Sequence, residues 1–132
     1  MLGLALLLGH LLGDYIFQND FMAWGKTSRR PTGDMNVWYT SHLICALHCV
    51  AYTLGVYATV LSVQSFPWWF YAAVCVIHWP VDRYSLAKWW MTRVSGQKAF
   101  ATGACSPWSI VVVDNVFHLL TLYVLAIIAG AK

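Results

Sequence analysis

Apolar residues fill four long stretches of the chain, separated by segments that are polar or rich in turn-forming residues. Each stretch has close to the ~20 residues that a helix needs to cross the hydrocarbon core of a bilayer. The pattern therefore predicts an all-α protein, a bundle of four transmembrane helices in a single domain over residues 1–132. The expected spans cover about residues 2–21, 37–61, 68–87 and 107–129.

Composition supports a polytopic membrane protein. Hydrophobic residues make up 60% of the chain and charged residues only 10%, whereas about 25% of the residues in an ordinary soluble domain are charged. No Lys or Arg precedes the first apolar stretch, and that stretch carries His10 and Asp14. We therefore interpret it as the first spanning helix rather than as a cleavable signal peptide.

The basic residues predict the orientation of the chain in the membrane. They gather in two segments, one with Lys26, Arg29 and Arg30, the other from Lys88 to Lys98. Four spans place these segments on the same side, and the positive-inside rule assigns that side to the cytoplasm, with both termini outside. The net charge of +3 is modest, and most of the basic residues lie in these two segments, so the charge favours membrane orientation over nucleic-acid binding.

Three pairs of ionisable residues interrupt the apolar stretches. In each pair a histidine and an aspartate stand four positions apart, a spacing that places both side chains on one face of a helix. Ionisable groups at membrane depth are costly and by default mark a functional site. The pairs are His10 with Asp14, His78 with Asp82, and Asp114 with His118.

The expected topology places all three pairs at the same depth. Asp14 and Asp82 lie five to seven residues before the cytoplasmic ends of their spans, and Asp114 lies about seven residues after the start of its span. At a rise of 1.5 Å per residue these positions are roughly 8–11 Å from that membrane face. The second span adds His42 and His48 at matching depths, six residues apart, so only one of them is expected to face the other pairs fully.

Imidazole and carboxylate groups that converge between helices are typical ligands of a transition metal such as zinc, manganese or iron. The sequence therefore predicts an intramembrane metal site near the cytoplasmic side, with the three aspartates as candidate catalytic residues. Gln18 and Asn115 are candidates for residues that hydrogen-bond to the metal ligands without binding the metal themselves. Arg83 and Lys88 are candidates for holding an anionic group, although snorkelling towards the lipid headgroups also explains them.

Several functions remain compatible with such a site. The first is a metal-dependent hydrolase of a lipid or lipid-linked substrate, with metal-activated water. The others are a metal or proton transporter, a haem bundle with opposed histidines, and a non-catalytic membrane effector in which the metal supports folding. Asp–His hydrogen bonds that join helices without any metal are the structural alternative. The predicted partners are membrane lipids, and self-association of the chain stays open.

Four motifs in order along the chain resemble the small phage and bacterial membrane proteins grouped as domain of unknown function 3307. The resemblance covers nearly the whole chain and implies an inner-membrane location but no established activity. It also implies His48, rather than His42, as the polar position of the second span, with Tyr52 one turn later. A looser likeness is to membrane-bound metal-dependent hydrolases. The motifs are HLLGDYIFQ from His10, HCVAYT from His48, HWPVDRYSLAK from His78 and DNVFH from Asp114.

The resemblance and the pairs together give one set of expected metal ligands. Four are histidines and three are aspartates, and each span contributes at least one of them. Gln18, Tyr52 and Asn115 are expected to contact these ligands without binding the metal. The ligands are His10, Asp14, His48, His78, Asp82, Asp114 and His118.

Overall fold

The computed structural model describes residues 1–26 and 35–131, and over these residues the protein is all-α, as predicted, with no strand. Four long helical segments are joined by shorter helices. In chain order the elements are α1 (Leu2–Leu11), the π-helical turn η1 (Leu12–Ile16), α2 (Asp20–Gly25), α3 (Met35–Val60), α4 (Trp68–Arg83), α5 (Leu86–Arg93), α6 (Lys98–Thr102) and α7 (Trp108–Ile128).

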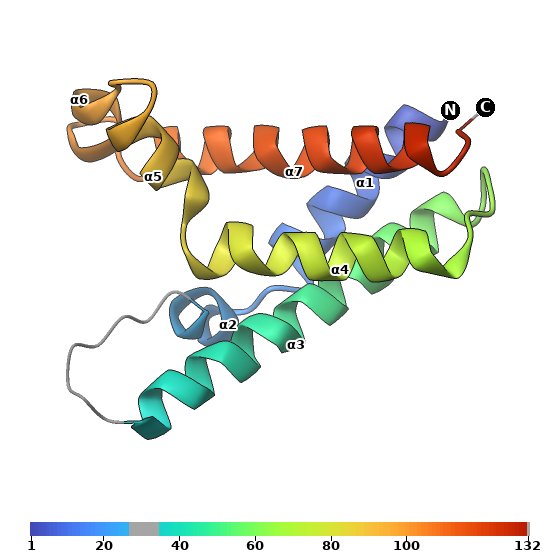
Figure 1. Ribbon diagram of the computed structural model, residues 1–132, viewed down its shortest axis with the longest axis horizontal. Helices are drawn as coiled ribbons and strands as arrows, with labels where there is room; N and C mark the ends of the chain where they lie inside the picture. Colours follow the sequence, from blue (N-terminus) through green and yellow to red (C-terminus); the bar gives the residue numbers. More distant parts are fainter. Residues whose placement is uncertain (27–34, 132) are drawn as a thin grey trace.

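The helices pack into an elongated bundle (Figure 1). α4 lies beside α7, and α3 packs against both α1 and α4. The start of α1, the end of α7 and the connection from α3 to α4 lie at one end of the bundle (Figure 1). The short helices α2, α5 and α6 lie at the other end (Figure 1).

An apolar core fills the half of the bundle nearer the start of α1. Side chains from α1, α3, α4 and α7 meet there, and the core continues up to Tyr52, which lies next to the ionisable residues. Its buried members are Ala5, Leu6, Tyr52, Val56, Val60, Phe66, Phe70, Val74, Leu122, Leu125 and Ala126.

Among the residues that the structure describes, two helical segments are long and apolar enough to cross a membrane: Tyr39–Val60 within α3, and α7. The other two expected spans are shorter than predicted. The first helical run ends at Ile16 rather than near residue 21, because the Asn19 side chain accepts a hydrogen bond from the Met22 amide and starts a new helix. α4 ends at Arg83 rather than near residue 87, because Ser85, two residues after its end, takes a left-handed conformation with φ of 50°.

Two glycines four residues apart let the first helical run approach α3 closely. A β-carbon on Gly9 would lie 2.7 Å from the Val56 α-carbon, and one on Gly13 would lie 2.9 Å from the Tyr52 α-carbon. Small residues at this spacing are typical of tight helix contacts in membranes. His10 directly follows Gly9 and Asp14 directly follows Gly13, so the contact places both side chains against the middle of α3.

Candidate metal centre

The three predicted pairs each form within one helical run. His10 Nδ1 lies 3.4 Å from Asp14 Oδ2, His78 Nε2 lies 3.3 Å from Asp82 Oδ2, and His118 Nε2 lies 3.3 Å from Asp114 Oδ2. The bundle then brings the pairs together with a histidine of α3. We call the resulting group the His/Asp cluster: His10, Asp14, His48, His78, Asp82, Asp114 and His118.

Asp82 is the centre of the cluster, and its side chain is only 2% exposed. Its Oδ2 atom lies 3.0 Å from His48 Nε2 and 3.3 Å from His78 Nε2. Its Oδ1 atom lies 3.1 Å from His118 Nε2. This one carboxylate therefore touches histidines from three helices, α3, α4 and α7.

His48 is the most crowded imidazole of the cluster. Its Nε2 atom lies 3.1 Å from His78 Nε2 and 3.2 Å from Asp14 Oδ1, in addition to the Asp82 contact. The whole side chain is buried. A ring nitrogen carries either one proton or one in-plane lone pair, so these neighbours cannot all be its hydrogen-bond partners at once.

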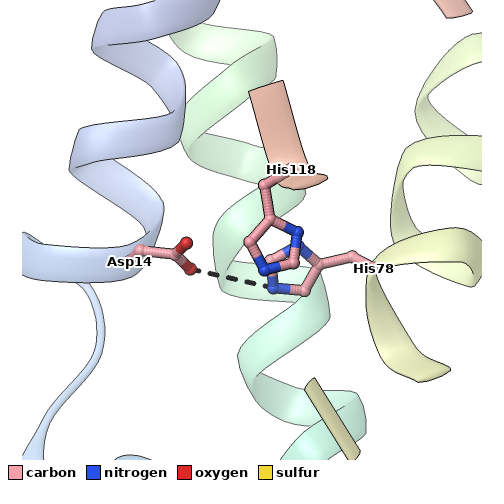
Figure 2. Close-up of side chains that lie close together, drawn as sticks. All are labelled: Asp14, His78 and His118. Carbon is pink, nitrogen blue, oxygen red and sulfur yellow. Dashed lines mark ion pairs between the residues drawn. The ribbon is translucent and has the colours of Figure 1, made fainter. Parts of the chain in front are cut away.

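Figure 2 shows how η1, α4 and α7 bring Asp14, His78 and His118 together. The two imidazole rings are stacked, with centroids 4.1 Å apart and planes inclined by 24°. The Asp14 carboxylate points at the rings, and its Oδ1 atom lies 3.7 Å from His78 Nε2. Stacking leaves the nitrogens at the ring edges free to face the carboxylates.

Three overlapping sets within the cluster could hold a metal ion, each with its ligand atoms within 4.8 Å of one another. The sets mix imidazole nitrogen with carboxylate oxygen, which suits zinc, manganese or iron. Every set contains at least one residue of another set. The sets are His48, His78 and Asp82; Asp82, Asp114 and His118; and Asp14, His78 and His118.

Lys26, which the sequence assigned to a basic segment, lies inside the site. Its ammonium group donates to Asp82 Oδ2 at 2.5 Å and lies 3.3 Å from His48 Nε2. Burial alone would lower the pKa of Lys26, but the surrounding carboxylates, Asp82 first and then Asp14 and Asp114, together outweigh burial, and the pKa lies above its usual value. The ammonium group is therefore a fixed positive charge beside the most buried carboxylate.

His10 belongs to a hydrogen-bonded chain at the edge of the cluster. Its Nε2 atom lies 2.7 Å from Asn115 Oδ1, and its Nδ1 atom lies 3.1 Å from the Tyr52 hydroxyl. It is a member of none of the three sets. Asn115 and Tyr52, which the sequence predicted as partners of the metal ligands, therefore both contact His10. Tyr15, which the sequence did not single out, donates from its hydroxyl to Asn115 Oδ1 at 3.1 Å.

The remaining predicted residues lie outside the cluster. Gln18 Oε1 is buried and has no hydrogen-bond partner among the described residues. His42 stacks on Trp79, with ring centroids 5.2 Å apart. Arg83 is buried at the end of α4, whereas Lys88 on α5 is exposed. Arg29 and Arg30 fall outside the described residues.

In a comparison with known families the chain matches the family described as protein of unknown function (DUF3307) over residues 2–131. The match spans essentially the whole chain and includes every residue of the His/Asp cluster. No curated protein and no solved structure matches the chain.

Proposed function

The chain belongs to the DUF3307 family, and from the geometry of the His/Asp cluster we propose that it is an integral membrane protein that binds a divalent transition metal between its helices. We propose further that the metal serves the hydrolysis of a lipid or lipid-linked substrate at the cytoplasmic face of a bacterial inner membrane.

The exposed surface of the long helices supports a membrane location. Leu43, Leu47 and Leu54 on α3 are each more than half exposed, and α7 exposes large apolar side chains along its whole length. Contiguous apolar surface of this extent is rare on soluble monomers and marks contact with lipid or protein. The shorter segments α1–η1 and α4 pack between these helices, and we propose that they lie in the membrane too.

The contacts of His48 Nε2 carry the metal proposal. This one atom has four polar neighbours within 3.3 Å, from Asp82, His78, Asp14 and Lys26. One hydrogen bond accounts for a single neighbour. A metal ion between the atoms satisfies several of them at once, because it binds the lone pairs of all its ligands.

The size of the first ligand set fits a small ion. The His48 Nε2, His78 Nε2 and Asp82 Oδ2 atoms form a triangle with sides of 3.0, 3.1 and 3.3 Å. A tetrahedral zinc site with bonds of 2.0–2.1 Å has edges of about 3.3 Å. The triangle therefore matches one face of such a site, and Asp14 Oδ1, 3.2 Å from His48 Nε2, is near enough to supply a fourth ligand.

The charges of the cluster also favour a divalent cation. Three carboxylates, those of Asp14, Asp82 and Asp114, face one ammonium group, that of Lys26. The difference is two negative charges in a buried site, where uncompensated charge is expensive. One divalent ion neutralises it without protonating any histidine.

Hydrolysis is supported by the uneven exposure of the ligands. The Asp82 side chain is almost completely buried, but the Asp114 side chain is 30% exposed and lies in the first half of α7, the half nearer α5 and its exposed Lys88. A catalytic metal needs one position open to water and substrate. In the proposed reaction water adds its hydroxyl group to the phosphorus or acyl carbon, an aspartate takes the proton, and that proton then passes to the departing oxygen.

Transport across the membrane is less well supported. The cluster is followed, towards the start of α1, by the apolar core, in which Val56, Phe70 and Leu122 are almost completely buried. An ion or proton pathway would need polar groups through this half of the bundle. A membrane effector with a structural metal remains the alternative to the hydrolase, and it would share the same ligands.

The decisive experiment measures the metal content of untagged protein that is purified in detergent without exposure to any chelator. We expect a transition metal bound to the wild-type chain, absence of a haem absorption spectrum, and loss of the metal in Asp82→Asn. Asp20→Asn, which changes an exposed carboxylate on α2, is the control and should retain the metal. A metal-free wild-type chain that is folded and takes up no added zinc or manganese would contradict the proposal.

The reaction is tested separately on the metal-loaded protein. Lipid phosphates and lipid esters are incubated with the wild-type chain and with Asp114→Asn, with and without added zinc or manganese. Turnover that requires both the metal and Asp114 supports the hydrolase. Metal binding without any turnover of these substrates would favour the effector with a structural metal.

A further inference from the structure

The two oxygens of Asp82 face different partners. Oδ2 is directed at His48 and His78, the first ligand set, whereas Oδ1 lies 3.1 Å from His118 Nε2. His118 Nε2 in turn lies 3.3 Å from Asp114 Oδ2. The first set accounts for neither Oδ1 of Asp82 nor the Asp114 carboxylate.

We propose that Asp82, Asp114 and His118 hold a second divalent metal ion, so that Asp82 bridges two metals through its two oxygens. The inference rests on the proposed function, because it needs a metal at the first set. It adds a second ion with its own ligands and, through that ion, a class of substrate.

The contacts of the second set follow the same logic as those of the first. A single Nε2 atom of His118 faces two carboxylate oxygens at 3.1 and 3.3 Å, although it has at most one proton to donate. These separations are again close to the ligand-to-ligand edge of about 3.3 Å expected around a small ion. A metal that binds all three atoms removes the conflict.

The two sets differ in access. The first set is buried on all sides, since His48, His78 and Asp82 are each less than 5% exposed. The second set includes Asp114, whose side chain is 30% exposed. Only three protein ligands surround the second ion, so it has positions left for water or substrate, as catalytic metals do.

A bridged pair of ions also indicates the substrate class. Paired catalytic metals lie about 3.5–4 Å apart and together hold the attacking and leaving oxygens of a displacement at phosphorus. Two divalent ions carry one positive charge more than the three carboxylates of the cluster, and that excess attracts an anion. We therefore infer that the preferred ligand of the open position is a phosphate group of a membrane-associated molecule, rather than an uncharged carboxylic ester.

Lys26 would have to leave the centre when both ions are bound. Its ammonium group contacts both Asp82 Oδ2 and His48 Nε2, two ligands of the first ion. An ammonium group that stays in contact with both of these ligands would lie close to the divalent ion, and the two positive charges would repel each other. The displaced ammonium group would then lie near the phosphate site as a further positive charge.

Manganese binding to the full-length, metal-free protein in detergent tests the second ion. Mn²⁺ is titrated with bound ions counted per chain, and the electron paramagnetic resonance spectrum reports whether the ions are coupled. We expect two ions with an exchange-coupled spectrum in the wild type. Asp114→Asn should bind one ion, with the spectrum of isolated Mn²⁺, and Asp20→Asn should bind two.

The possible outcomes separate the two proposals. Saturation of the wild type at one ion would overturn the second site and leave the proposed function intact, whereas no binding at all would overturn both. Two ions retained in both Asp114→Asn and His118→Gln would show that the second ion lies elsewhere. No ion bound by a folded Asp114→Asn chain would mean a single site that includes Asp114, which also overturns the bridged pair. Gel filtration verifies the fold of each variant.

The substrate class is tested with inorganic phosphate as the probe. Phosphate should perturb the coupled manganese spectrum of the wild type and leave the spectrum of Asp114→Asn unchanged. A wild-type spectrum that does not change on addition of phosphate would contradict the proposal that the open position binds a phosphate group.

Discussion

The Nε2 atoms of His48 and His78 lie 3.1 Å apart and both face the same oxygen of Asp82. The two imidazoles come from different helices, α3 and α4, and each is buried. Two ring nitrogens that share one carboxylate oxygen at this separation could serve as two ligands of one ion. This relationship makes the first ligand set the point where mutation should have its largest effect.

Replacement of His48 or His78 with alanine should therefore abolish metal binding at the first set. Each substitution removes one of the three ligands of the first set, and even with Asp14 as a further ligand the remaining atoms cannot form a closed four-ligand site. His42→Ala is the matched control, because His42 lies on the same helix as His48 but stacks on Trp79 outside the cluster. Metal content measured by mass spectrometry should fall in the first two variants only; an equal loss in His42→Ala would place the metal elsewhere.

Lys26→Met should raise the affinity for metal, by roughly tenfold or more, because the substitution removes a positive charge that contacts two ligands. The metal-free variant should be less stable than the wild type. Removing one partner of a buried ion pair costs about 3–5 kcal/mol, since Asp82 is left uncompensated.

Zinc titration and thermal unfolding in detergent measure the two effects of Lys26→Met. Saturating zinc should restore its thermal stability, and Lys26→Arg, which keeps the charge, should behave like the wild type. If zinc does not restore the stability of Lys26→Met, Lys26 is the permanent structural partner of Asp82, and this outcome would contradict a metal at the first ligand set.

The three His–Asp pairs could be predicted from the sequence, because each depends only on the four-residue spacing within one helical run. His10 and Asp14 share a helix face, as do His78 and Asp82, whatever the packing around them. The all-α class follows from the apolar stretches for the same reason. These features are local, and local patterns determine them.

The place of Lys26 and the central role of Asp82 depend on tertiary packing and could not be predicted in this way. The three pairs look equivalent in the sequence, and only the angles between α3, α4 and α7 decide which aspartate touches the most histidines. Lys26 lies after an apolar stretch, where hydropathy and the positive-inside rule count it as a loop charge. The early end of the first helical run, at Ile16, and the Asn19 cap that follows it are what bring α2 and Lys26 back to the site.

Gly13→Ala should destabilise the protein by about 1–3 kcal/mol, the usual cost of forcing extra volume into a packed contact. The new methyl group would lie 2.9 Å from the Tyr52 α-carbon, so η1 and α3 must separate. Because Asp14 is the next residue, metal affinity should fall as well. Gly3→Ala is the control, since no atom lies within 4 Å of its added β-carbon. Equal thermal stability of the two variants in detergent would show that the close helix contact is dispensable.

The proposed topology places the end of the bundle with α2, α5 and α6 in the cytoplasm and the other end outside. At the C-terminus, a fused reporter should therefore be active only if it is a type that works outside the cytoplasm. At Gly96, in the connection between α5 and α6, an inserted reporter should be active only if it is a type that works in the cytoplasm. Gly96 suits an insertion because no atom lies within 4 Å of its added β-carbon. A cytoplasmic C-terminus would overturn the four-span topology, although the His/Asp cluster would be unaffected.

His10→Ala distinguishes a ligand from a supporting residue. The sequence predicted His10 as a metal ligand, but both of its ring nitrogens lie within hydrogen-bond distance of other side chains, those of Asn115 and Tyr52. Tyr52 in turn stacks on His78, with ring centroids 3.8 Å apart, so the chain of contacts ends at a ligand of the first set. Loss of such an outer partner typically weakens metal binding by 10–100-fold without removing the site.

We therefore expect His10→Ala to bind as many metal ions per chain as the wild type, with an affinity lower by roughly 10–100-fold. Asn115→Ala should have a smaller effect in the same direction, because it acts on the metal only through His10. Competition with a chelator of known affinity measures both, and the metal-to-chain ratio at saturation decides the role. A ratio that falls by one ion in His10→Ala would make His10 a ligand, as the sequence alone suggested, and would require the imidazole to turn away from Asn115 when the metal binds.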